Sequence, residues 1–252
     1  MKRERYLGPF SRSALPAWEC PGCTSGALKL EKGSLKVEET AKSKSHRADP
    51  NWEPDWSESR FSMTLRCSHC NEPVFVVGDV EQAEAMDEEF GWCFEEALRP
   101  RFFVSPISII PLPDLCPQDI TDEIRAASSL YWADVSASAN RIRSAIEKTL
   151  DHKKIKRSEK IQSGKNAGKN RRLSLHERIE LFKQKDAQLA DTMLAIKWLG
   201  NAGSHASDLN EKDILDAFEL MEHVIEELFV EKLKKIRSIT KKINTKKGPV
   251  NG

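Results

Sequence analysis

The sequence lacks the features that would place it in a membrane or outside the cell. No apolar run approaches the ~18 residues needed to cross a bilayer, so we expect no membrane-spanning segment. The basic N-terminus, MKRERYLGPFSRS, has no apolar stretch behind it and does not resemble a signal peptide. Six cysteines among 252 residues are too few for a disulfide scaffold. These absences favour a globular cytoplasmic protein.

Motifs of several common enzyme classes are missing as well. The chain has no nucleotide-binding glycine loop, no recognisable Ser/His/Asp spacing and no paired carboxylates of the kind that hold metals in nucleases. We therefore expect no small-molecule cofactor. Hydrophobic residues make up 39% of the chain, which is too many for a wholly disordered protein. The sequence predicts a folded protein whose function does not depend on any of these motifs.

Charge is balanced overall but strongly segregated along the chain. The net charge is +1, yet residues 153–172 hold nine bases and one acid. From Lys232 to the C-terminus there are eight bases and no acid, whereas residues 79–98 hold eight acids and no base. Two basic patches on an acidic body attract a polyanion such as RNA or DNA. The alternative left open by the composition is that both basic stretches are solvated and poorly ordered.

Four of the cysteines form the strongest motif. Cys20-Pro-Gly-Cys23 and Cys67-Ser-His-Cys70 are two CxxC turns, and two such turns complete a four-cysteine zinc site. An all-thiolate tetrahedral site has no open coordination position, so one structural Zn²⁺ per chain is predicted. A redox dithiol pair and an iron–sulfur cluster are the alternatives. His69 lies between two ligands and is expected to point away.

Short apolar runs in the N-terminal part favour β-strands around the second CxxC turn. FSMTLRC at 61–67 leads into it and PVFVV at 73–77 leaves it, which is the connectivity of a zinc ribbon. Gly78 is expected to close the second run as a turn. The polar stretch 38–60 predicts a long inserted loop with two tryptophans, and residues 80–100 predict a short acidic helix.

Helical periodicity begins after a proline-rich stretch. Four prolines between 104 and 117 predict an extended linker, because each removes a backbone donor. Capping-box patterns at Ser174 and Asn210 mark two helix starts. The fold class expected is mainly α, an antiparallel helical bundle preceded by a small β zinc-ribbon domain. The predicted domains are a ribbon with its inserted loop and short acidic helix over 1–103, a linker over 104–117, a helical domain over 118–238 and a basic tail over 239–252.

A second group of polar residues is a candidate catalytic site. Asn201 and His205 are four residues apart, so they share a face if the helix continues through them. His205 could act as a general acid or base, and Arg141, Arg143 and Glu147 lie on another helix that could face it. The structural alternative is that His205 caps a helix and Arg143 pairs with Glu147.

Several segments together resemble bacterial proteins built on the domain of unknown function DUF4145. They are WECPGC, RCSHC, YWADVSASANRIRSAIEKTLD, LHERIELF and LAIKWLGNAGSH. The resemblance implies a HEPN-like helical domain in a defence- or stress-related system. It also implies a homodimer formed through that domain. The last helix supports a dimer independently, because it carries two apolar stripes that include Ile214 and Leu215.

The resemblance also implies a possible activity. Many HEPN domains are metal-independent ribonucleases that use an Arg and a His; aligned on His205, the polar residue is Asn201 and the Arg slot is Gly200. We therefore expect a non-catalytic module that binds nucleic acid or protein. One alternative is a metal-independent endoribonuclease using His205, Asn201 and an Arg such as Arg141 or Arg143. Another is an accessory protein whose ribbon docks on DNA or a partner.

Overall fold

The chain consists of two compact units and contains more β-structure than expected. The computed structural model describes residues 1–53, 56–87, 91–202 and 209–249. One unit comprises Met1–Ile109 with Ser128–Asp134, and the other Ile110–Ala127 with Val135–Gly252. Helices account for 43% of the protein and strands for 21%. The expectation of a mainly α protein was therefore wrong, because a large antiparallel sheet occupies most of the first unit.

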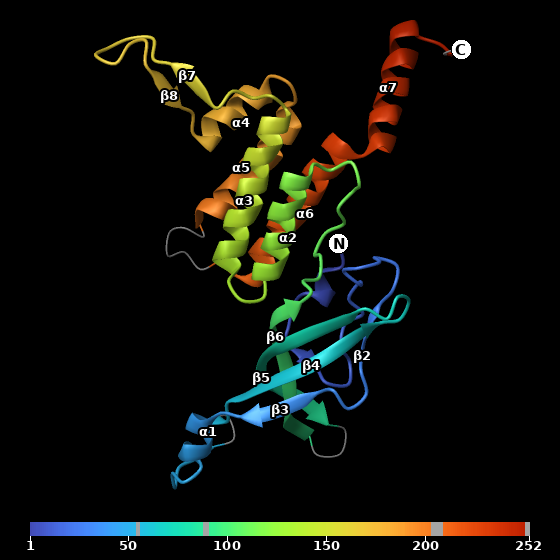
Figure 1. The fold of residues 1–252 in the computed structure, drawn as a ribbon, viewed down its shortest axis with the longest axis vertical. Helices are drawn as coiled ribbons and strands as arrows, with labels where there is room; N and C mark the ends of the chain where they lie inside the picture. The colour runs from blue at the N-terminus through green and yellow to red at the C-terminus, as the bar shows by residue number, and fades with distance from the viewer. Residues whose placement is uncertain (54–55, 88–90, 203–208, 250–252) are drawn as a thin grey trace. The chain divides into compact units, whose positions relative to one another are not determined.

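That sheet is antiparallel and has the strand order β1–β6–β5–β4–β2, with β3 also paired to β4 (Figure 1). Its strands are β1 Phe10–Ser11, β2 Leu28–Leu30, β3 Lys36–Glu39, β4 Ser59–Cys67, β5 Pro73–Asp87 and β6 Gly91–Val104. A 3₁₀ turn at Arg3–Arg5 and the helix α1 at Ala41–His46 complete the unit. The predicted strands at 61–67 and 73–77 are confirmed, and the inserted loop contains α1 and parts of β3 and β4.

The region predicted as an acidic helix is a long β-hairpin instead. β5 and β6 pair from Phe75 opposite Val104 to Asp87 opposite Gly91, and β5 continues past the predicted turn with a register shift between Val77 and Gly78. Arginines neutralise some of the acids across the strands: Arg101 binds Asp79 at 2.7 Å, and Arg99 binds Glu81. Cross-strand pairing within this hairpin outweighs local helix preference.

An aromatic cluster forms the core of this unit. Trp18 is 1% exposed and packs edge-on against Phe103, with ring centroids 5.2 Å apart. Trp132 lies 4.9 Å from Phe103, and the Tyr131 hydroxyl donates a 3.1 Å hydrogen bond to the Tyr6 carbonyl. Tyr131 and Trp132 directly follow the helix Gln118–Leu130, and the segment Ser128–Asp134 belongs to the β unit rather than to the bundle.

The other face of β5 and β6 is apolar and exposed. Phe75 pairs with Val104, and Val77 pairs with Phe102. Their exposed fractions run from 44% for Val77 to 63% for Val104. Because side chains alternate along a strand, their neighbours Val74 and Val76 point to the opposite face and are fully buried.

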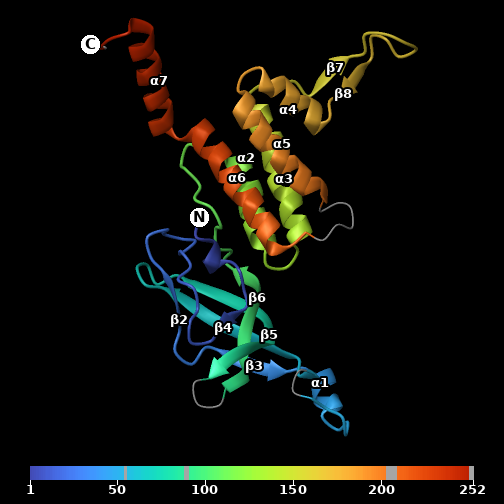
Figure 2. The ribbon, with the colours of Figure 1, turned by 180° about the vertical axis from the view of Figure 1, so that it is seen from behind.

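The second unit is a helical bundle with one small hairpin (Figure 2). Its elements are α2 Gln118–Leu130, α3 Val135–His152, β7 Ser158–Lys160, β8 Asn170–Arg172, α4 Leu175–Lys183, α5 Ala187–Ala202, α6 Glu211–Phe229 and α7 Glu231–Lys246. The last three residues of α2 belong to the first unit. The capping boxes at Ser174 and Asn210 are confirmed, each with both reciprocal hydrogen bonds. Helix α5 passes through Gly200 and ends at Ala202.

Both apolar stripes of α6 are buried in the core of the bundle. Ile214, Phe218, Met221 and Ile225 are buried, and so are Leu215, Val224 and Leu228. Helix α6 therefore offers no spare apolar stripe to a second copy. Trp198 of α5 is 57% exposed and lies beside His176. A homodimer through this domain stays a prediction, without the support first taken from α6.

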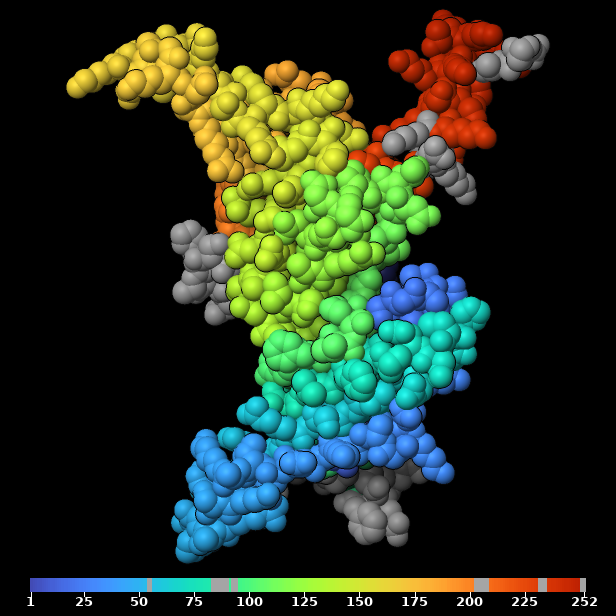
Figure 3. All heavy atoms as spheres, in the orientation of Figure 1, coloured from blue at the N-terminus to red at the C-terminus, as the bar shows by residue number. Residues whose placement is uncertain are grey.

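The basic segment 153–172, predicted as a loop, contains the hairpin β7–β8, which projects from the bundle (Figure 3). Buried Ile155 and Leu173 anchor its two ends. Within it, Glu159 binds Lys156 at 2.9 Å and also pairs with Arg171. Two apolar anchors and a paired acid thus order a segment whose composition indicated disorder.

Most of the C-terminal basic stretch is also ordered, as helix α7. Isoleucines at 236, 239 and 243 form an exposed stripe along it, with exposed fractions of 43–48%. Within the described part of the chain, no helix combines the length and apolarity that a membrane crossing requires.

Candidate functional site

The two CxxC turns bring four thiols together in the first unit. The Sγ atoms of Cys20, Cys23, Cys67 and Cys70 all lie within 4.8 Å of one another. Cys20 and Cys70 are 3.7 Å apart, and Cys23 and Cys67 are 3.6 Å apart. A tetrahedral metal with ligands at about 2.3 Å requires sulfur atoms about 3.8 Å apart, so the cluster has the dimensions of a metal site. The side chain of His69 is not part of it.

The two turns have the same local geometry. In the first, the Thr24 N–H donates to the Cys20 carbonyl at 3.0 Å; in the second, the Asn71 N–H donates to the Cys67 carbonyl at 3.1 Å. Both closing residues are left-handed, with φ of 53° for Thr24 and 63° for Asn71. Backbone N–H groups also donate to sulfur, as from Gly22 to Cys20 at 3.3 Å. Such donors stabilise a thiolate.

Strand pairing aligns the two turns. Leu28 of β2 lies opposite Cys67 of β4, which brings the segment after the first turn against the second. The Ser68 N–H donates to the Ala27 carbonyl at 2.9 Å. Gly26 permits this approach, because a Cβ there would overlap the Cys67 sulfur and lie 2.8 Å from the His69 Cβ. The register of one short strand therefore assembles the site.

The surroundings of Cys67 and Cys20 shift the pKa values of these two thiols in opposite directions. The N–H of Cys70 and, to a lesser extent, that of His69 lower the pKa of Cys67 to about 6, although burial acts in the opposite direction. Burial raises the pKa of Cys20. Thiolates are soft ligands that select metals such as zinc. A thiol that ionises near neutral pH favours metal capture, because the metal binds the deprotonated form.

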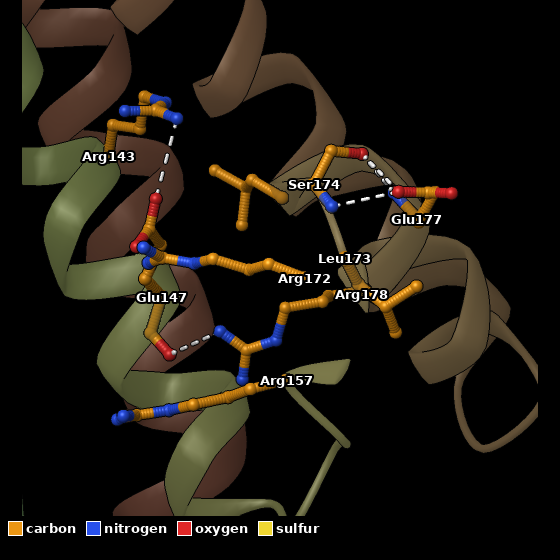
Figure 4. A pocket seen from close by; sticks show the side chains of 9 residues that line it. Arg143, Glu147, Arg157, Arg172, Leu173, Ser174, Glu177 and Arg178 are labelled. Carbon is orange, nitrogen blue, oxygen red and sulfur yellow. Dashed lines mark hydrogen bonds and ion pairs between the residues drawn. The ribbon is translucent and has the colours of Figure 1, made fainter. Parts of the chain in front are cut away.

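A second candidate site is a cavity in the helical unit, referred to below as the arginine pocket (Figure 4). It has a volume of about 450 Å³. Its lining residues are Arg143, Glu147, Arg157, Arg172, Leu173, Ser174, Leu175, Glu177 and Arg178. The arginines come from α3, from the segment after α3, from β8 and from α4. Four guanidinium groups from distant parts of the sequence thus line one cavity.

Arg178 anchors the pocket from within. Its side chain is 6% exposed and binds Asp151 at 2.6 Å. It also donates to the carbonyls of Glu147 at 3.4 Å and Ile155 at 3.2 Å. Hydrogen bonds from Arg157, and then from Arg178, lower the pKa of Asp151, so this carboxylate stays charged at neutral pH. Two arginines therefore share one carboxylate.

Most of the second unit matches the model of a known protein family. Residues 125–246 match the family model described as domain of unknown function DUF4145. The chain carries a DUF4145 domain. Residues 8–103 match another model, domain of unknown function DUF8608. No match was found among curated proteins or among solved structures. The DUF4145 match covers α3 to α7 and therefore includes the whole arginine pocket.

The residues predicted as catalytic are divided between different surroundings in the DUF4145 domain. Arg143 binds Glu147 at 3.4 Å, while Arg141 points away and binds Glu123 of α2 at 3.2 Å. Asn201 is half-buried near the end of α5, and His205 lies outside the described residues. The structure therefore pairs Arg143 with Glu147 and directs Arg141 elsewhere.

Gly200 has a packing role in the DUF4145 domain. A Cβ at this position would lie 2.9 Å from the Arg143 Cβ and 3.4 Å from the Ala139 carbonyl oxygen. Contacts this short require α3 and α5 to move apart. Gly200 therefore faces α3 next to the stem of Arg143, and this position leaves no room for a side chain.

Sequence reasoning missed three of the pocket arginines as site residues. Arg157 and Arg172 were counted only as part of the basic segment 153–172. Arg178 gave no signal, because a charged residue in a helix ordinarily faces solvent. Only the packing of α4 against α3 reveals that Arg178 is buried and lines the same cavity as the others.

We predict that Gly26→Ala impairs metal binding. The added methyl group would overlap the Cys67 sulfur, so that thiol must leave its position. We expect less than half of the wild-type metal content by elemental analysis of protein purified without chelator. The matched control is Gly22→Ala, whose methyl group would lie 3.7 Å from the nearest atom, an ordinary contact. Equal metal content in both variants would contradict the prediction.

Proposed function

We propose that this protein is a zinc-stabilised, non-catalytic module that binds nucleic acid in a bacterial defence- or stress-related system. In this proposal the four cysteines hold one Zn²⁺ that stabilises the β unit. The DUF4145 domain binds the phosphate backbone of RNA or DNA. The observation that carries the proposal is the position of the basic hairpin β7–β8, which leads directly into the arginine pocket.

The charges on the hairpin support backbone binding. Lys160, Lys165 and Lys169 are exposed on a segment that projects from the bundle. None of the three forms an ion pair within the described residues. Exposed lysines without an ion-pair partner can neutralise phosphates and release counterions, which supplies affinity without sequence specificity. Helix α7 adds a second basic segment, which includes the exposed Lys235, Lys241, Lys242 and Lys246.

Zinc is proposed because of the donor set. Four thiolates close the coordination shell, so zinc would hold the two turns together without binding substrate. The small β unit gains stability from such a centre, as other small domains do.

Binding should depend steeply on salt and on the hairpin. We expect anisotropy titrations with labelled single-stranded RNA and DNA to give an affinity that falls as salt rises, with a log–log slope of about −2 for three phosphates. Replacing the three hairpin lysines by Gln should weaken binding at least tenfold. The matched control replaces Lys29, Lys32 and Lys36, three exposed lysines of the β unit, and changes the net charge equally.

Two outcomes of this experiment would overturn the proposal. One is the absence of any salt-dependent binding. The other is an equal loss in both triple variants, which would mean that only net charge matters. Denaturing gels of the same RNA mixtures test the ribonuclease alternative. Cleavage that His205→Ala abolishes would replace the non-catalytic proposal.

A further inference from the structure

We propose that the arginine pocket binds a phosphate monoester. Two sources supply this chemistry, the terminal phosphate of a nucleic-acid strand and a free nucleoside monophosphate. The choice of a nucleic-acid strand as the first source rests on the proposed function. The binding chemistry itself rests on the pocket.

The shape of the pocket suits a small anionic ligand. Figure 4 shows the side chains of Arg172 and Arg178 extending from the α4 side toward α3, where Arg143 and Glu147 lie. The cavity volume of about 450 Å³ lies within the range of about 300–1,000 Å³ that is typical of small-ligand sites. Guanidinium groups match phosphate oxygens with two parallel hydrogen bonds, so arginine is the residue expected in such a site.

The arginines that line the pocket are not fully neutralised by carboxylates. Arg178 and Arg157 share Asp151, and Arg143 is paired with Glu147. Glu177 is bound by Arg171, which lies outside the lining, at 2.7 Å. Arg172 has no ion-pair partner within the described residues. The lining therefore holds more guanidinium groups than carboxylates to neutralise them.

Two buried donors also lack a partner. The Nε atoms of Arg143 and Arg178 are inaccessible to solvent, and neither has a hydrogen-bond acceptor in the part of the chain that the structure describes. A buried N–H without an acceptor is costly, and an anion in the cavity can order the guanidinium groups around it. Because the Arg178 side chain is buried, its guanidinium group is held in a fixed position within the pocket, unlike the charges of flexible surface residues.

The amount of uncompensated charge favours a monoester over an internal phosphodiester. A terminal phosphate carries about −1.5 to −2 charges at neutral pH and presents three acceptor oxygens. A phosphodiester carries one charge and two free oxygens. Several converging arginines therefore gain more from the monoester, and we expect about tenfold tighter binding of a phosphorylated strand.

The experiment compares one single-stranded oligonucleotide in three forms: 5′-phosphate, 3′-phosphate and no terminal phosphate. Adenosine monophosphate, with adenosine as its control, tests the free nucleotide by calorimetry. The variant is Arg172→Gln, because Arg172 is exposed and removing it leaves no carboxylate unpaired. The matched control is Lys160→Gln, which removes one charge from the same hairpin. Thermal unfolding of both variants should match the wild type.

We expect the wild type to prefer one phosphorylated end about tenfold, Arg172→Gln to lose that preference and Lys160→Gln to keep it. Equal affinity for all three strands, with no binding of adenosine monophosphate, would overturn the inference while leaving the proposed function intact. A preference that survives Arg172→Gln would overturn it as well. Binding of adenosine monophosphate alone, lost in Arg172→Gln, would support the pocket and argue against the proposed function.

Discussion

Cys67→Ser should remove the bound metal and unfold the β unit. A structural zinc site contributes about 10–16 kcal/mol of apparent binding energy in small domains, which is comparable to or larger than the typical stability of a domain, about 5–15 kcal/mol. Cys67 also ends β4 and accepts hydrogen bonds from the N–H groups of His69 and Cys70. Elemental analysis should show less than one metal per ten chains.

Hydrogen exchange should localise the damage. We expect the amides of β2, β4 and β5 to lose protection, together with residues 128–134, because Tyr131 and Trp132 pack in the same aromatic cluster. The amides of α3, α5 and α6 should keep their protection, since these helices have their own core. The matched control is Cys116→Ser, which changes a buried cysteine outside the cluster. A Cys67→Ser protein that binds one metal and keeps its strands protected would refute the prediction.

Arg178→Met should destabilise the DUF4145 domain by about 3 kcal/mol or more. Removing one partner of a buried ion pair leaves an uncompensated charge, here on Asp151, and two backbone carbonyls lose their donor. The matched control is Arg157→Gln. Arg157 binds the same carboxylate, but its side chain is 68% exposed, so its loss should cost within about 1 kcal/mol. Urea unfolding followed by circular dichroism measures both values.

The pH dependence of this difference provides a second test. The pKa of Asp151 is lowered in the folded protein, so the stability it contributes is complete above its ordinary pKa of about 3.9. That contribution is lost as the pH falls through the lower folded value. The gap between wild type and Arg178→Met should therefore shrink below about pH 4. A gap that is small at pH 7, or that widens in acid, would show that Arg178 does not stabilise Asp151.

The sequence by itself determined the four-cysteine cluster. The two CxxC turns contain all four cysteines, because the spacing of cysteines within each turn is a local property of the chain. The helix starts at Ser174 and Asn210 could also be predicted from the sequence, since a capping box is made within a single turn. The DUF4145 domain was also evident, because its characteristic segments are short and contiguous.

Only the tertiary structure decided the β-sheet and the arginine pocket. Residues 80–100 were predicted as an acidic helix, but they pair mainly with one another in the β5–β6 hairpin, and only Val80, Ala97 and Leu98 among them pair with β4 or β1. The burial of Arg178 depends on the packing of α4 against α3. Nothing in the sequence distinguishes Gly26 and Gly200 from other glycines. In the structure, each lets two segments approach more closely than a side chain allows. Contacts between distant residues are set by packing, and packing is a property of the whole fold.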